Sequence, residues 1–215
     1  MIQPVSWDER REGWRKAEVA TEYDRVRFSG PLDRLKHRND ARRVLRLLAR
    51  AKKGPLHVLD APIGTGRLIP DLEGAGHRVT GVDLSPAMLR SGGVYANRGA
   101  VLAEVERLPF KADAFDATVT LRFLFHARDR GVRRRLLGEL ARVAPYLVLH
   151  ERCAETLKHS FRRARKKRGL RDAPTLAELG LELEAAGLRI AAFERVSTLF
   201  SDKVLVLAER RTGPI

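Results

Sequence analysis

The stretch from Leu56 to Asp83, LHVLDAPIGTGRLIPDLEGAGHRVTGVD, decides the fold of this chain. An apolar run ends at Asp60, a turn containing Gly64 and Gly66 follows, and a second apolar run ends at Asp83. A strand, a glycine turn, a helix and a second strand ending in a carboxylate are typical of a βαβ unit that holds a nucleotide-like cofactor. The stretch therefore predicts such a pocket.

Strands and helices are predicted to alternate beyond this unit, which indicates a mostly parallel sheet. The predicted strands are His57–Asp60, Arg78–Asp83, Ala100–Glu104, Asp116–Leu121, Tyr146–His150, Leu188–Val196 and Lys203–Glu209. The predicted helices are Arg67–Gly74, Pro86–Ser91, Gly131–Ala144 and Thr175–Ala186. Only residues 197–202 separate the last two strands, so that pair should be antiparallel, because a parallel return needs a longer crossover.

The N-terminal part, residues 7–53, reads as polar amphipathic helix broken at Ser29-Gly30-Pro31. A helical face is expected after the break, formed by Leu35, Val44, Leu45, Leu47 and Leu48. This segment looks like a lid or flanking helix that leads into the sheet.

Length and composition favour one α/β domain over residues 1–215, since 215 residues with 44% hydrophobic content suffice for one core. Within it we expect a helical flank (1–54), a cofactor-binding core (55–151), a basic insertion (152–173) and a C-terminal helix with a β-hairpin (174–215). No apolar run of about 20 residues and no signal-peptide pattern is present, so we expect a cytoplasmic protein without a membrane span. The single Cys153 is read as a quiet thiol, and no metal site is expected.

Glycine at positions 64 and 66 tolerates unusual backbone angles and lets a ligand approach the main chain. A dinucleotide-binding turn would carry a third glycine at position 69, which is Ile69 here. Asp83 has two readings: it accepts hydrogen bonds from ribose hydroxyls, or it caps the following helix. We favour the ribose role, because Ser85 before Pro86 is better suited to cap that helix.

Three ordered motifs, VLDAPIGTGRL, VTGVDLSPAML and AEVERLPFKADAFDATV, resemble the class I S-adenosylmethionine-dependent methyltransferases. The likeness is greatest to the methyltransferase type 11 group, which includes small-molecule and quinone methyltransferases, and it covers about Val58 to Glu151. It implies a Rossmann-like, seven-stranded, mostly parallel sheet with an antiparallel C-terminal hairpin and helices on both faces. It also implies S-adenosylmethionine as the cofactor and S-adenosylhomocysteine as the product.

The resemblance assigns cofactor-binding roles residue by residue. Asp60 would lie near the ammonium, Asp83 would bind the ribose, Leu84 would pack on adenine, and Glu104 with Val105 would meet the adenine edge. Arg122 would lie where the methyl group emerges. The N-terminal residues Tyr23, Arg27 and Phe28 would either close over the cofactor or form a solvated helix end. The cofactor-binding set is Tyr23, Asp60, Ala61, Pro62, Gly64, Gly66, Asp83, Leu84, Glu104, Val105 and Arg122.

Candidates for a general base are His126, His150 and Glu151, which follow predicted strands at the edge where sites form in open α/β sheets. Each has an alternative role in packing or in ending a strand. The acceptor is expected to be a small or lipid-like molecule, with an anionic one among the options.

The inserted segment CAETLKHSFRRARKKRGLR carries a run of cations that favours an anionic partner, although such a run is also typical of a solvated helix face. The candidate cations for nucleic acid are Arg162, Arg163, Arg165, Lys166, Lys167 and Arg168. The net charge of +15 has the same two readings, an anionic partner or an arginine-rich composition. An RNA methyltransferase, a catalytically silent binding module and, more remotely, a nicotinamide oxidoreductase stay as alternative functions.

Overall fold

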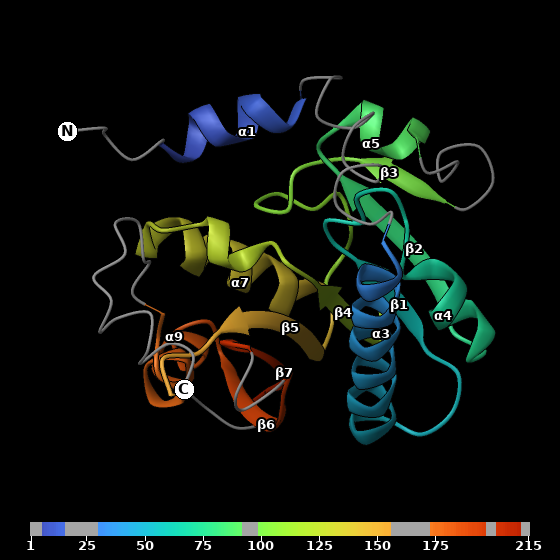
Figure 1. The fold of residues 1–215 in the computed structure, drawn as a ribbon. Coiled ribbons are helices and arrows are strands. Elements are labelled where there is room, and N and C mark those ends of the chain that lie inside the picture. Colours follow the sequence, from blue (N-terminus) through green and yellow to red (C-terminus); the bar gives the residue numbers. More distant parts are fainter. Residues whose placement is uncertain (1–5, 16–29, 92–98, 156–172, 197–200, 212–215) are drawn as a thin grey trace.

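The computed structural model describes residues 6–15, 30–91, 99–155, 173–196 and 201–211 (Figure 1). The helices are α1 (Trp7–Arg15), α3 (Pro31–Ala51), α4 (Ile69–Gly74), α5 (Pro86–Ser91), the 3₁₀ turn η1 (Leu124–His126), α7 (Arg130–Val143) and α9 (Leu176–Glu184). The strands are β1 (His57–Asp60), β2 (Arg78–Asp83), β3 (Ala100–Leu102), β4 (Ala117–Thr120), β5 (Tyr146–Arg152), β6 (Leu188–Arg195) and β7 (Lys203–Arg210).

The strands form one seven-stranded sheet in the order β3-β2-β1-β4-β5-β7-β6. Strands β1 to β5 are parallel, and β7 runs antiparallel to both β5 and β6. The predicted fold class and the antiparallel C-terminal pair are therefore confirmed. Because the parallel strands point the same way, the carboxyl ends of β1, β2, β4 and β5 meet at one edge of the sheet.

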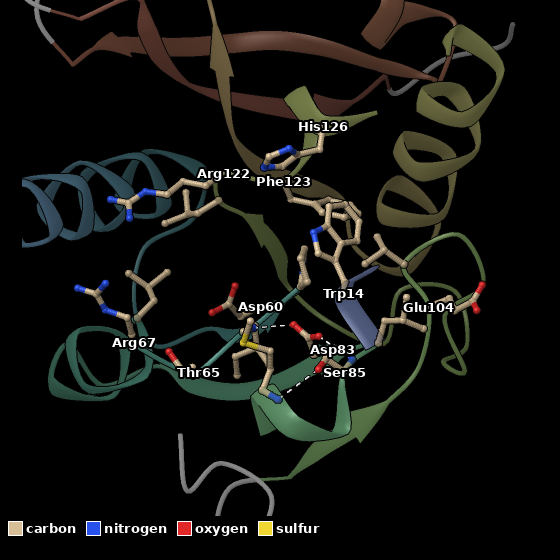
Figure 2. Close-up of a pocket in the computed structure, with 18 of the residues that line it drawn as sticks. Trp14, Asp60, Thr65, Arg67, Asp83, Ser85, Glu104, Arg122, Phe123 and His126 are labelled. Atoms are coloured by element: carbon tan, nitrogen blue, oxygen red, sulfur yellow. Dashed lines mark hydrogen bonds between the residues drawn. The ribbon is translucent and has the colours of Figure 1, made fainter. Parts of the chain in front are cut away.

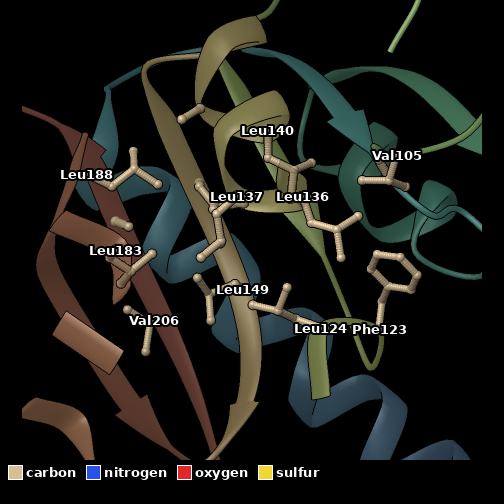
Figure 3. Close-up of a cluster of buried hydrophobic side chains, with 14 of the residues drawn as sticks. Val105, Phe123, Leu124, Leu136, Leu137, Leu140, Leu149, Leu183, Leu188 and Val206 are labelled. Atoms are coloured by element: carbon tan, nitrogen blue, oxygen red, sulfur yellow. The ribbon is translucent and has the colours of Figure 1, made fainter. Parts of the chain in front are cut away.

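Two hydrophobic clusters lie on opposite faces of the sheet. Along β5, Leu147 and Leu149 belong to the cluster under α7 and α9, whereas Val148 belongs to the cluster under α3. This alternation follows from the period of two along a strand. Figure 3 shows Leu137 of α7 on the side of β5, whereas Leu136 of α7 is directed toward Phe123. Helices thus cover both faces, as predicted.

Several element boundaries differ from the predicted ones. Strand β3 stops at Leu102, because the chain then bends and Glu104 forms an isolated bridge with Arg107. Strand β5 continues past His150 to Arg152, because β7 pairs with it along its whole length.

The helix α3 begins at Pro31, at the predicted break, and buries three of the five expected apolar residues: Val44, Leu47 and Leu48. Leu45 is half-buried, and Leu35 is 46% exposed, so it lies outside the core. None of the described helices has the length and apolar character needed to cross a membrane.

Candidate active site

The turn after β1 forms the floor of the site. Gly64 and Gly66 have φ angles of 58° and 74°, in the left-handed region that favours glycine. The turn is tied to the neighbouring strand, because the Ile63 amide donates to the Val82 carbonyl over 2.7 Å. The peptide bond between Ala61 and Pro62 is cis. The backbone of this turn is therefore fixed against the end of β2.

The carboxylate of Asp83 is held at that junction. Its Oδ2 accepts from the Gly64 amide over 2.8 Å, and its Oδ1 accepts from the Ser85 amide over 2.9 Å. The Ser85 hydroxyl in turn accepts from the Met88 amide over 3.3 Å, so Ser85 caps α5, as predicted. Each oxygen of Asp83 has a second lone pair, which leaves this carboxylate able to accept from two ribose hydroxyls.

Asp60 and Asp83 make this end of the site strongly acidic. Asp60 is 4% exposed, and burial, followed by the negative charge of Asp83, raises its pKa to about 8. Burial also raises the pKa of Asp83, although its hydrogen bonds from the backbone oppose that shift. Two buried carboxylates that repel each other are stabilised when a cation comes between them. This donor set suits a ligand with positive charge and vicinal hydroxyls, which are the groups S-adenosylmethionine presents.

A cavity of about 590 Å³ opens above these residues (Figure 2). Nine of the predicted site residues line it: Asp60, Pro62, Gly64, Asp83, Leu84, Glu104, Val105, Arg122 and His126. Ala61 and Gly66 belong to the same turn but do not line the cavity. Tyr23, Arg27 and Phe28 lie outside the described residues, as does the cationic run at 162–168.

The three candidate bases are in different surroundings. His126, in η1, lines the cavity, with its ring centroid 5.7 Å from that of Trp14. His150 is fully buried and does not line the cavity. Glu151 is also buried, and its Oε2 forms an ion pair of 2.9 Å with Arg133. The catalytic role of all three stays a prediction, and the geometry favours His126.

The helix α1 covers the cavity and contributes residues that the sequence analysis missed. Trp7, Arg11 and Trp14 line the cavity from this helix. The Trp7 indole donates to the Glu106 carboxylate over 2.7 Å, and the Trp14 ring lies 5.8 Å from the Phe123 ring. Residues 7, 11 and 14 share one helical face, so their spacing was a signal for this role.

Glu104 joins α1 to the cofactor side of the cavity. Arg15 pairs with its Oε1 over 2.7 Å, and Arg11 pairs with its Oε2. The carboxylate predicted to meet the adenine edge is thus also the anchor of the covering helix.

The opposite end of the cavity is cationic. Arg67 and Arg122 line it, and Figure 2 shows both guanidinium groups on the same side, away from Glu104. Arg122 pairs with Asp40 of α3 over 2.8 Å and has a φ angle of 58°, which is uncommon for a residue with a side chain. The cavity therefore has an acidic region at one end and a basic region at the other.

Comparison with known proteins agrees with this site. Residues 59–145 match the family model described as a methyltransferase domain. Over 81 residues the chain is 36% identical to an 18S rRNA (guanine-N(7))-methyltransferase of Bos taurus; the match spans 37% of this chain and 29% of the bovine protein. The likeness therefore concerns the shared domain and not the whole bovine enzyme.

Solved structures with the same fold cover nearly the whole chain. A magnesium protoporphyrin IX methyltransferase from Synechocystis, with bound S-adenosylhomocysteine, aligns with a TM-score of 0.74 at 22% identity, covering 96% of this chain and all of that one. A 1,6-didemethyltoxoflavin-N1-methyltransferase from Burkholderia thailandensis aligns with a TM-score of 0.69 at 19% identity, covering 99% and 94%. These alignments show that the chain shares the fold of these methyltransferases, and residues 59–145 match the model of a methyltransferase domain.

Proposed function

We propose that this protein transfers the methyl group of S-adenosylmethionine to a small-molecule or lipid-like acceptor by in-line displacement. The observation that carries the proposal is the pair of buried carboxylates, Asp60 and Asp83, beneath the Gly64–Gly66 turn. A nicotinamide dinucleotide would bring a diphosphate to this turn, where the buried carboxyl groups of Asp60 and Asp83 disfavour further negative charge.

In this proposal each part of the cofactor has a partner among the residues lining the cavity. Asp83 takes the ribose hydroxyls, and Asp60 lies near the ammonium. Leu84 packs on adenine, while Glu104 and the Val105 amide meet its edge. Their positions at successive strand ends support this order, because β1, β2 and β3 are neighbours in the sheet.

The cofactor supplies a methyl group that is already activated by its sulfonium. The protein must then align the acceptor and exclude water, and alignment alone contributes about 7 to 11 kcal/mol to lowering a barrier of this kind. Trp14 and Phe123 present an apolar wall that keeps water from the cavity. His126 lines the same space and would accept a proton from an acceptor that still carries one.

A small acceptor, or the end of a larger one, is favoured by the size and cover of the cavity. A volume of about 590 Å³ lies in the range of sites for small ligands. The helix α1 also restricts access, since Trp7 and Trp14 line the cavity from above. The Burkholderia structure, which contains 1,6-didemethyltoxoflavin, provides a precedent for a small acceptor on this fold.

Calorimetric titration with S-adenosylmethionine, S-adenosylhomocysteine and NAD tests the proposal. We expect the first two to bind and NAD to give no heat of binding. Binding of NAD in their place would mean that the cavity serves a different cofactor.

An RNA acceptor is the second candidate, because the bovine relative is an rRNA methyltransferase and the 158–171 segment is strongly basic. Affinity for RNA that falls steeply with salt, together with methylation of that RNA, would favour it over a small acceptor. Binding of S-adenosylhomocysteine without methyl transfer to any class of acceptor would instead favour a silent binding module.

A further inference from the structure

A second charged cluster lies at the carboxyl edge of the sheet, beside the basic end of the cavity. Arg152 of β5 is the register partner of Lys203 of β7, and His150 is the register partner of Leu205. Leu205 and Val148 belong to the hydrophobic cluster under α3. Because side chains alternate along a strand, His150, Arg152 and Lys203 therefore occupy the α3 face of the sheet.

Positive charge exceeds negative charge among the described residues of this cluster. Three cations, Arg122, Arg152 and Lys203, meet two carboxylates, Asp40 and Asp202. Arg122 pairs with Asp40 over 2.8 Å, and Arg152 approaches Asp202 over 3.4 Å. Lys203 forms no ion pair within 4.0 Å among the described residues. Burial, and then the charge of Arg122 and of Arg152, lower the pKa of its ammonium, so the cations repel one another.

Polar atoms in this cluster also lack hydrogen-bond partners. His150 is fully buried, and neither of its ring nitrogens has a hydrogen bond to the described residues. The Nε of Arg152 is likewise buried and has no hydrogen-bond partner in the part of the chain that the structure describes. Buried donors without partners destabilise a fold unless a bound group satisfies them. Burial lowers the pKa of His150 to about 3, so the ring is neutral and offers one N–H donor.

We infer that His150, Arg152 and Lys203 form a binding site for an oxyanion, a carboxylate or phosphate group carried by the acceptor. The inference rests on the proposed function, since it names the acceptor's chemistry. Arg122 connects the two sites. It lines the cavity, and its positive charge lowers the pKa of the Lys203 ammonium. An acceptor held by its anionic group at this cluster extends past Arg122 toward the cofactor. Arg152 is also oriented by Phe125, whose ring centroid lies 5.6 Å from the guanidinium carbon.

The test uses inorganic phosphate and acetate as probes of the full-length protein at low ionic strength. Affinity is measured by calorimetry, and the ring nitrogens of His150 are followed by NMR. We expect phosphate to shift the His150 resonances of the wild-type protein. Lys203→Gln and Arg152→Gln should each weaken phosphate binding about tenfold, the effect of losing one hydrogen bond to a charged group. The matched control is Lys53→Gln, an exposed lysine at the other edge of the sheet, which should change the affinity less than about twofold.

Lys203→Arg keeps the charge and should retain phosphate binding, which separates loss of the site from loss of the fold. S-adenosylhomocysteine affinity is measured in parallel for every variant. If the wild-type protein does not bind S-adenosylhomocysteine, the proposed function is wrong. If it does, but phosphate and acetate fail to bind, or bind the Gln variants and Lys53→Gln equally well, the oxyanion site is wrong.

Vesicles distinguish the two sources of the anionic group. Binding to phosphatidylglycerol vesicles and not to phosphatidylcholine vesicles, lost in Lys203→Gln, would assign the oxyanion to a lipid headgroup. Phosphate binding without vesicle binding would assign it to a soluble acceptor.

Discussion

The two halves of the sheet's carboxyl edge are opposite in charge. At the ends of β1 and β2, and just after β3, lie carboxylates that line the cavity: Asp60, Asp83, Glu104 and Glu106. Beyond β4 and along β5 and β7 lie the cations Arg122, Arg152 and Lys203. Both halves use the same geometry, in which neighbouring strands end at one edge. The side chains therefore decide which ligand each half receives.

The contrast also shows how little the total charge indicates about a site. The chain carries a net charge of +15, yet at its cofactor end burial, followed by the negative charge of Asp83, raises the pKa of Asp60 to about 8. A cationic cofactor and an anionic acceptor are both attracted to such an edge, each to a different half. If the two halves act separately, a substitution in one half should leave the ligand affinity of the other half unchanged.

The largest effect is expected from Asp83→Ala, which removes the centre of the acidic half. Cofactor binding should weaken by roughly 1.5 to 3 kcal/mol, because hydrogen bonds to a charged group are lost. Calorimetry with S-adenosylhomocysteine measures this loss. Glu184→Ala, which removes an exposed carboxylate at the end of α9, is the control and should leave the affinity unchanged. Equal affinity of Asp83→Ala and the wild-type protein would place the ribose elsewhere.

A smaller effect, with a defined pH dependence, is expected from Asp60→Asn. In the free protein the pKa of Asp60 is raised to about 8, so at pH 7 the group is mostly protonated. A bound ammonium favours the ionised form, so binding at pH 7 should release a proton, and affinity should rise toward pH 8. Asp60→Asn should abolish the proton release and weaken binding about tenfold at pH 8. Titrations in buffers of different ionisation enthalpy measure the proton, and release that persists in the variant would assign it to another group.

The same carboxyl group affects the stability of the free protein. Its folded pKa is raised above the ordinary value, so its contribution is fully present below about pH 4 and is lost as the pH rises toward 8. Thermal melts of Asp60→Asn should therefore show a weaker decline of stability over this range, which serves as an internal check on the titrations.

The acidic half could be predicted from sequence because its signals are local. Asp60, Gly64 and Gly66 lie within one turn, and Asp83 follows at the end of the next strand. The cover of the cavity could not be predicted in the same way. The contact between Trp7 and Glu106 joins residues 99 positions apart. The spacing of apolar residues along the sequence does not predict a contact between such distant residues.

In the basic half, the predicted end of the fifth strand was wrong for a related reason. The fifth strand was predicted to end at His150, which placed His150 and Glu151 at a strand end, open to substrate. Pairing of Arg152 with Lys203 extends the strand by two residues, so both positions lie inside the sheet. A hairpin that returns from far along the chain decided this boundary, and strand propensity alone does not reveal it.

A modest effect is expected where α1 meets the acidic half. Replacing Arg11 and Arg15 by Gln removes both partners of Glu104, and partly exposed pairs of this kind contribute about 0.2 to 1 kcal/mol each. Bound S-adenosylhomocysteine should then dissociate about two to five times faster, measured by stopped-flow displacement. The same two changes made in a Glu104→Gln background should increase the dissociation rate of S-adenosylhomocysteine little further. Tighter binding would instead mean that the arginines compete with adenine for Glu104.

Arg189→Gln is the control for that experiment, because Arg189 pairs with Glu209 on the β6–β7 hairpin and not with the cavity. Its dissociation rate should match that of the wild-type protein. The comparison thus separates release of α1 from a general loss of positive charge.

The smallest effect on the cofactor is expected from the basic insertion. Changing Arg165, Lys166, Lys167 and Arg168 to Gln should leave S-adenosylhomocysteine affinity within about twofold, because none of the four belongs to the predicted cofactor-binding set and salt screens distant charges. The rate of methyl transfer to the acceptor should change if these cations contact the acceptor. For an RNA acceptor, the slope of log affinity against log salt should fall by about 3, since each single-stranded phosphate contact contributes about 0.7.

The matched control removes the same four charges from exposed positions of α3 and the loop after it: Arg38, Arg42, Arg50 and Lys53. Both variants lower the net charge from +15 to +11, so a general electrostatic effect acts on both alike. A change in the salt slope only in the first variant assigns the contact to the insertion. Equal slopes for the two variants would leave the insertion as a solvated face, and the acceptor would then meet the cations at the carboxyl edge instead.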